Sequence, residues 1–250
     1  MAHAESVIAP DRLLELVGCL EAAKGFAEVV ASLQAGHGAT FDGVRGSSCA
    51  LVAATLAQHT PGPLVVVCPQ AGEVDDFCDE LNLFTSIQPI RFPAWETLTA
   101  ERTVHDEVFG DRLRVLKELQ ERNDEPGTRS GGDVRSRAVG TSSTGTNSTG
   151  HGPARIVVAG IQALLQPVPS PELLAAQTRR VATGDTIDVE ALVKWLVEQG
   201  FESTSAVELP GEFSNRGGIL DLFAPDWFDP VRVELFGDQV ESIRRFEAAS

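Results

Sequence analysis

The chain has 250 residues and a formal net charge of −16, from 20 basic and 36 acidic residues. This length fits one large domain or two modest ones. The acidic surplus argues against free-standing binding to nucleic acid or to an anionic membrane surface, because both require an excess of lysine and arginine. No apolar run reaches the roughly 18 residues of a membrane-spanning helix and no signal peptide is visible, so we expect a cytoplasmic protein with no membrane partner.

The cysteine and histidine spacing predicts no metal site. Cys19, Cys49, Cys68 and Cys78 form no Cys-x-x-Cys pair, and the five histidines have no ligand spacing. We therefore expect the four cysteines to be buried, reduced thiols.

Helix and strand patterns alternate along residues 1–176. Helical spacing of apolar residues predicts helices within 11–35, 50–58, 70–84 and 104–121. Continuous apolar runs predict buried strands at 64–68 and 156–159, and residues 90–92 are a weaker candidate. This alternation predicts a three-layer α/β domain with a parallel sheet, of the Rossmann or RecA-like type.

Residues 123–152 interrupt this pattern. Gly, Ser and Thr make up more than half of the segment, and large apolar residues are scarce. Such a composition cannot bury enough surface to offset its ordering entropy, so we predict a disordered insertion within the first domain.

The composition changes after about residue 176, and residues 177–250 predict a smaller α+β domain built on an antiparallel sheet. A helix is expected at 188–199, followed by strand-like segments at 205–209, 218–223, 231–236 and 239–246. Gly237-Asp238 lies between the last two segments and predicts a tight hairpin turn.

The loop that begins at Gly43 has the position of a phosphate-binding loop, because a glycine-containing turn precedes an apolar helix and an apolar strand follows that helix. A working loop reads G-x-x-x-x-G-K-[ST], with the lysine on the outer phosphates and the hydroxyl on magnesium. Here Gly43 and Gly46 are present, but Ser48 replaces the second glycine of the motif, Cys49 the lysine and Ala50 the hydroxyl residue. The loop is therefore either a nucleotide site that has lost ATP hydrolysis or a plain strand-to-helix turn. An active ATPase is the weakest alternative.

Residues 211–223 read GEFSNRGGILDLF, and the strand-like segments that follow contain RVELF at 232–236 and ESIRRF at 241–246. Because side chains alternate along a strand, Arg232, Glu234 and Phe236 are expected on one face. That face is either a solvated surface of compensating charges or a protein-binding surface, since forked guanidiniums beside an aromatic ring suit a polar partner.

These motifs resemble the second domain of the bacterial excision-repair helicase UvrB and, more closely, the N-terminal part of the transcription-repair coupling factor family (Mfd). Residues 92–98 (FPAWETL) and 162–166 (QALLQ) match stretches of the same family. The decayed loop at Cys49 and Ala50 favours the coupling factors over UvrB. The resemblance covers most of residues 30–250, apart from the insertion.

The resemblance implies a UvrB domain 1A-like first domain and a UvrB domain 2-like second domain that docks on the repair ATPase UvrA. It implies UvrA contacts by Arg216, Arg232 and Phe236. On this basis Arg232→Ala is predicted to weaken UvrA binding severely without unfolding the domain. The family's RNA polymerase and double-stranded DNA partners, and the ATP and magnesium of its translocase motor, are implied only for domains beyond this chain.

Besides an acidic interaction scaffold with no specific repair role, two functions therefore stay open. The first is a non-catalytic docking module that recruits UvrA to RNA polymerase stalled at DNA damage, with no catalytic residues, cofactor or metal in this segment. The alternative is a fragment of a UvrB-like, ATP-dependent DNA-damage helicase. That alternative requires ATP binding and a long aromatic-rich hairpin, and no such hairpin is evident between residues 90 and 155.

Overall fold

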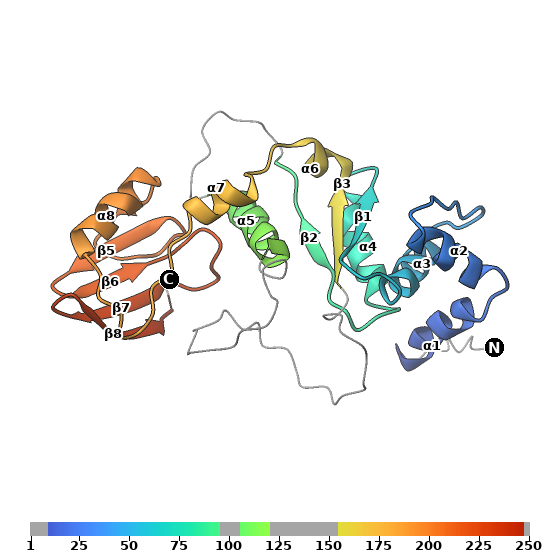
Figure 1. Cartoon of the computed structure of the whole chain (residues 1–250), viewed down its shortest axis with the longest axis horizontal. Helices are drawn as coiled ribbons and strands as arrows, with labels where there is room; N and C mark the ends of the chain where they lie inside the picture. Colours follow the sequence, from blue (N-terminus) through green and yellow to red (C-terminus); the bar gives the residue numbers. More distant parts are fainter. Residues whose placement is uncertain (1–9, 96–105, 121–154, 248–250) are drawn as a thin grey trace, which may run out of the picture. The chain divides into compact units, whose positions relative to one another are not determined.

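The structure is a computed structural model that describes residues 10–95, 106–120 and 155–247. These residues form two compact units (Figure 1). The first unit contains 10–94 and 155–166, and the second contains 95, 106–120 and 167–247. The predicted insertion at 123–152 lies outside the described residues. The two-domain division at residue 176 stays a prediction.

The first unit contains a parallel sheet in the order β1-β3-β2. Its strands are β1 (Leu64–Cys68), β2 (Ile90–Phe92) and β3 (Ile156–Gly160), and its helices are α1 (Pro10–Glu21), α2 (Phe26–Gln34), α3 (Ser47–Ala57), α4 (Glu73–Leu81) and α6 (Ile161–Leu165). Side chains of α1, α3 and α4 pack with alternate residues of β1 and β3 to form its core. The α/β class and the parallel sheet are thus confirmed. The three-layer arrangement stays a prediction, because this core defines one helical layer.

Strand β1 differs from its prediction as a fully buried strand. Val65 and Val67 are 50% and 45% exposed, while all five residues of β3 are buried. Among the described strands β3 is central and β1 pairs with β3 alone, so fewer neighbouring side chains cover β1. A continuous apolar run therefore overestimated the burial of this strand.

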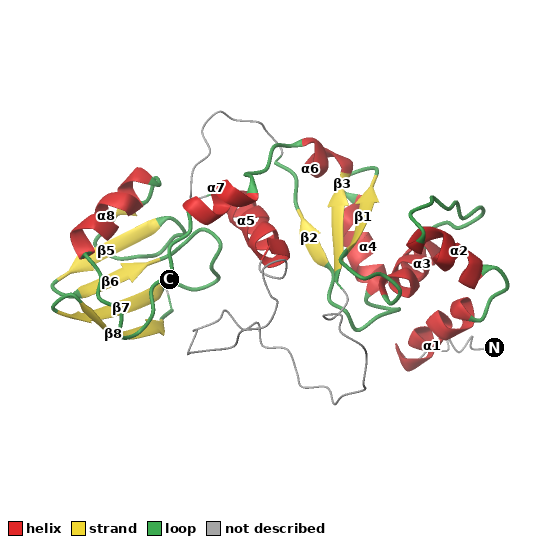
Figure 2. Ribbon diagram, viewed as in Figure 1, coloured by secondary structure: helices red, strands yellow, loops and turns green. Residues whose placement is uncertain are grey.

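The second unit contains a five-stranded sheet in the order β4-β5-β6-β7-β8 (Figure 2). Its strands are β4 (Glu202–Ser203), β5 (Glu212–Arg216), β6 (Ile219–Leu222), β7 (Val231–Phe236) and β8 (Gln239–Arg245), and its helices are α5 (Glu107–Gln120), α7 (Pro171–Ala176) and α8 (Val189–Glu198). The β4–β5 pair is parallel, so the sheet is mixed rather than purely antiparallel as predicted. The strand predicted at 205–209 is absent, and β5 was not predicted.

Helix α8 covers one face of this sheet. Asp188 caps its N-terminus by accepting a hydrogen bond from the Ala191 backbone N–H. Leu196 of the helix packs with the sheet residues Phe213, Leu220 and Val233, which are all at least 94% buried. The opposite face of the sheet is therefore left to the polar residues that alternate with these apolar ones.

Among the described residues, no helix has the length and apolar character needed to cross a bilayer.

The four cysteines are free thiols, but only two are buried. Cys68 and Cys78 lie in the first core, whereas Cys19 and Cys49 are exposed, which corrects the prediction of four buried thiols. Cys19 lies on a surface helix, and Cys49 lies in the first turn of α3. Burial raises the pKa of Cys78 to about 11, and burial and then Glu73 raise that of Cys68.

We expect a thiol reagent at pH 8 to label two cysteines of the folded chain and all four in denaturant. The reactive species is the thiolate, which burial suppresses at Cys68 and Cys78. At pH 9 Cys78 should still be labelled slowly, because a buried thiol with a pKa of about 11 is almost wholly protonated there. Peptide mapping of the labelled chain identifies the sites, and rapid labelling of Cys78 in the folded chain would contradict this assignment.

Candidate functional site

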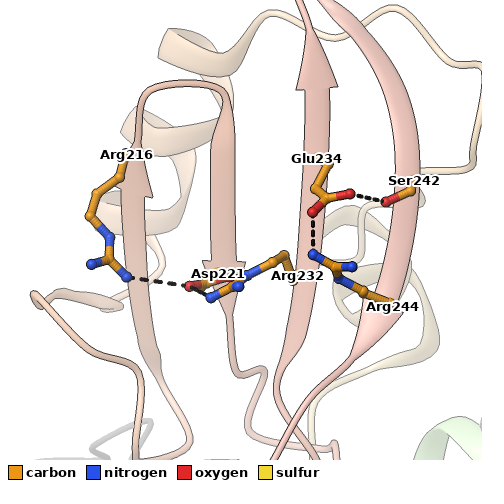
Figure 3. A network of polar contacts seen from close by, with 6 residues as sticks. All are labelled: Arg216, Asp221, Arg232, Glu234, Ser242 and Arg244. Carbon is orange, nitrogen blue, oxygen red and sulfur yellow. Dashed lines mark hydrogen bonds and ion pairs between the residues drawn. The ribbon is translucent and has the colours of Figure 1, made fainter.

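One face of the second sheet carries a network of charged side chains. The face lies opposite α8, and Figure 3 shows its members projecting from four neighbouring strands. We call this network, together with Phe236 at the end of β7, the polar face. Its charged and hydroxyl residues are Arg216 on β5, Asp221 on β6, Arg232 and Glu234 on β7, and Ser242 and Arg244 on β8.

Asp221 and Arg232 are directly opposite each other on β6 and β7 and form a bidentate ion pair. Arg232 Nε donates to Asp221 Oδ1 at 2.6 Å, and Nη2 donates to Oδ2 at 2.7 Å. The Asp221 side chain is 4% exposed and that of Arg232 is 30% exposed. The hydrogen bonds from Arg232 to Asp221 raise the pKa of Arg232, so this guanidinium stays charged.

Arg216 approaches the same carboxylate from β5, but less closely. Its Nη2 lies 3.6 Å from Asp221 Oδ2, and its side chain is 62% exposed. An ion pair that is this exposed and this long contributes little to holding the arginine in place. The two arginines that share Asp221 therefore differ, since Arg232 is fixed and Arg216 is loosely held.

A second carboxylate, Glu234, organises the other half of the face. It accepts a hydrogen bond from Ser242 Oγ at 2.6 Å and pairs with Arg244. The network in Figure 3 contains three arginines and two carboxylates, in a chain whose net charge is −16. Its exposed guanidiniums favour an approaching acidic group.

Two short turns shape one edge of the polar face. Gly217 and Gly218, with φ of 53° and 87°, connect β5 to β6, and Gly237, with φ of 62°, begins the predicted turn between β7 and β8. These left-handed conformations suit glycine and the two-residue turns of hairpins. Phe236 directly precedes the second turn and is 79% exposed. An aromatic side chain this exposed does not pack in the core, and its ring is accessible to a partner.

Figure 3 shows Arg216 and Arg232 on one face. Phe236 falls on the same side by strand alternation, because the preceding Leu235 packs against the core. Arg232 is nevertheless engaged within the fold. We therefore expect its loss to lower stability as well as binding, and that Arg232→Ala leaves the domain folded stays a prediction. Sequence reasoning missed Asp221, although a single acid between Leu220 and Leu222 in a strand was a visible signal.

The predicted phosphate-loop residues surround the start of α3. Gly43 and Gly46 have positive φ, and the helix begins at Ser47. Ser48 Oγ donates to the Arg45 carbonyl, Cys49 is exposed and Ala50 is fully buried. Neither Cys49 nor Ala50 presents a cation or a hydroxyl at this loop.

Carboxylates lie where an anion would have to bind. Ser47 Oγ donates to Glu80 Oε1 at 2.9 Å. A cavity of about 670 Å³ beside β1 is lined by Gly46, Cys49 and apolar side chains, together with Glu73, Asp76 and Glu80. The described lining of this cavity contains no lysine or arginine. Its charge therefore opposes binding of a nucleoside triphosphate.

Among the described residues, no group of three or more His, Cys, Asp or Glu side chains could hold a metal ion.

Comparison with known proteins identifies the second unit. Residues 180–250 match the family described as UvrB interaction domain. Over 200 residues the chain is 34% identical to the transcription-repair-coupling factor of Mycobacterium bovis, covering 80% of this chain and 14% of that protein. The corresponding protein of Myxococcus xanthus is 32% identical over 232 residues, covering 90% and 17%, and that of Bacillus subtilis is 29% identical over 208 residues, covering 82% and 15%.

The polar face thus belongs to a UvrB interaction domain. With its matches to coupling factors over most of its length, the chain is an N-terminal UvrB-like module of the transcription-repair coupling factor family (Mfd). It spans only 14 to 17% of the length of these relatives.

Proposed function

We propose that this segment is a non-catalytic docking module through which a transcription-repair coupling factor recruits UvrA to RNA polymerase stalled at DNA damage. The observation that carries the proposal is the polar face, which presents three arginines and an exposed Phe236 within the UvrB interaction domain. The domain match and the coupling-factor relatives support this role.

We further propose that the module neither binds nor hydrolyses ATP. The loop from Gly43 to Ala50 lacks the lysine and the metal-binding hydroxyl, and three carboxylates line the adjacent cavity. In the whole coupling factor, contacts with RNA polymerase and DNA, and the use of ATP and magnesium, would then belong to other domains. The cytoplasm is the expected location of such a protein.

The proposal is tested by titrating the fragment against purified UvrA. Arg216→Glu and Phe236→Ala are each expected to weaken binding about tenfold or more, because truncating a central anchor or reversing a contacting charge costs at least that much. Both side chains are largely exposed, so both variants should stay folded. Isothermal calorimetry measures the affinity and circular dichroism checks the fold.

The matched control is Lys194→Glu, which makes the same change in charge on α8, away from the polar face. Lys194 is 79% exposed and pairs only distantly with Glu198. We expect this variant to bind UvrA as the wild type does. Equal binding by all variants would keep the partner and reject the face, and a folded wild type that binds no UvrA would reject the proposed function.

A further inference from the structure

Asp221 is the most deeply buried charged residue of the polar face. It lies on β6, the middle strand of the five, with Ser214 opposite on β5 and Arg232 opposite on β7. Ser214 and Asp221 are each 2% exposed. A carboxylate removed from water in this way requires an opposite charge close by.

Asp221 binds its two arginine partners with different strength. Both carboxylate oxygens accept hydrogen bonds from Arg232, through Nε and Nη2, which fixes the plane of that guanidinium. Its Nη1 is not part of this bidentate contact. Arg216 meets only Oδ2, at 3.6 Å, and most of its side chain is in solvent. One carboxylate thus serves two guanidiniums and neutralises only one of them.

We propose that Asp221 is a positioning residue of the polar face. It holds Arg232 in one orientation and keeps Arg216 nearby but loosely bound, so that both guanidiniums are presented to a partner. The ligand that fits this arrangement is an acidic side chain of a protein partner. This inference rests on the proposed function of the face, and it assigns to Asp221 an effect on binding exerted through Arg232.

The test compares Asp221→Asn with Glu234→Gln. Both changes remove one carboxylate from the same network with little change in shape. Only Asp221 forms ion pairs with Arg232 and Arg216, whereas Glu234 acts on Arg232 through its charge alone. We expect Asp221→Asn to weaken UvrA binding at least tenfold and Glu234→Gln less than threefold. Both should be measured well below the melting temperature of each variant.

A double-mutant cycle separates positioning from a general structural effect. Arg232→Lys keeps a positive charge beside Asp221 but cannot form the bidentate contact of a guanidinium. It also replaces Asp221→Asn in the test if that variant does not fold. If Asp221 acts through Arg232, adding Asp221→Asn to Arg232→Lys should weaken UvrA binding further by less than threefold. A purely structural role would produce the same factor in both backgrounds and overturn the proposal.

A measurement without the partner completes the test. In NMR spectra of the fragment, the Arg232 Nε–H should be protected from exchange in the wild type and in Glu234→Gln, and lose its protection in Asp221→Asn. Unchanged protection in Asp221→Asn would overturn the positioning role. If the wild type binds UvrA and Asp221→Asn binds equally well, only the positioning role fails. If the wild type binds no UvrA, the proposed function fails as well.

Discussion

Replacing Arg232 with alanine is expected to lower the free energy of unfolding of the second unit by about 2–3 kcal/mol, in addition to weakening partner binding. Removing one member of a buried ion pair typically costs about 3–5 kcal/mol, because the remaining charge is left without a partner. The lower value applies here since Arg232 is itself 30% exposed, so its loss admits water to Asp221, and Arg216 remains nearby.

The measurement is chemical denaturation followed by tryptophan fluorescence. All three tryptophans, Trp95, Trp195 and Trp227, belong to the second unit, so this signal reports on that unit alone. Circular dichroism follows both units. Tracking them separately is necessary because a chain with two compact units is not assured of a single cooperative transition.

Two variants make the expectation specific. Arg216→Ala removes the other arginine beside Asp221 but should change stability by no more than about 0.5 kcal/mol, because the contact is long and exposed. The double variant Arg232→Met, Asp221→Leu should recover most of the lost stability, because no charge is then left buried without a partner. Equal stability of Arg232→Ala and Arg216→Ala would show that the bidentate pair does not support the fold.

The sequence was informative where local pattern and burial coincide. Alternation along β7 placed Arg232 and Phe236 on one face, and the glycine at 237 marked the hairpin, because both features depend on neighbouring residues. Strand β5 was missed because its sequence, EFSNR, lacks an apolar alternation. It forms by pairing with β4 and β6, which a local pattern does not encode.

The ion-pair partners of the charged residues could likewise not be predicted from the sequence. Nothing in the spacing of 11 residues between Asp221 and Arg232 specifies a bidentate pair, since the register of β6 and β7 decides it. The resemblance marked Arg232 as a partner contact but said nothing of its role within the fold. The exposure of Val65 and Val67 in β1 was missed for the same reason, because strand order depends on contacts between residues distant in sequence.

Helix α5 presents another long-range contact, to the loop that precedes β7. Residues 110, 114 and 117 lie on one side of the helix, as their spacing of four and three requires. Arg114 Nε donates to the Asp226 carbonyl at 3.1 Å, and Lys117 Nζ pairs with the Asp226 carboxylate at 2.9 Å. The Arg114 guanidinium also lies 3.9 Å from the centre of the Phe228 ring. At Gly110 the backbone of α5 lies closest to the backbone of this loop, at Pro225.

Gly110→Ala is therefore expected to destabilise the second unit, although alanine favours helices. A Cβ at this position would lie 2.1 Å from the Pro225 carbonyl oxygen, so the helix or the loop must move. Overpacking against backbone costs about 1–3 kcal/mol, and the shift would also lengthen the contacts of Arg114 and Lys117. Against a helix-propensity gain of up to about 1 kcal/mol, we expect a net loss of about 2 kcal/mol by tryptophan fluorescence.

The matched control is Gly18→Ala in α1, the same substitution within a helix. A Cβ at Gly18 would meet nothing within 4 Å, and its φ is not positive. This variant should stabilise the first unit by up to about 1 kcal/mol, measured by circular dichroism, since only the helix propensity changes. If Gly110→Ala also stabilised the protein, α5 would not be held against the loop at 225–228, and the contacts of Arg114 and Lys117 would not contribute to the second unit.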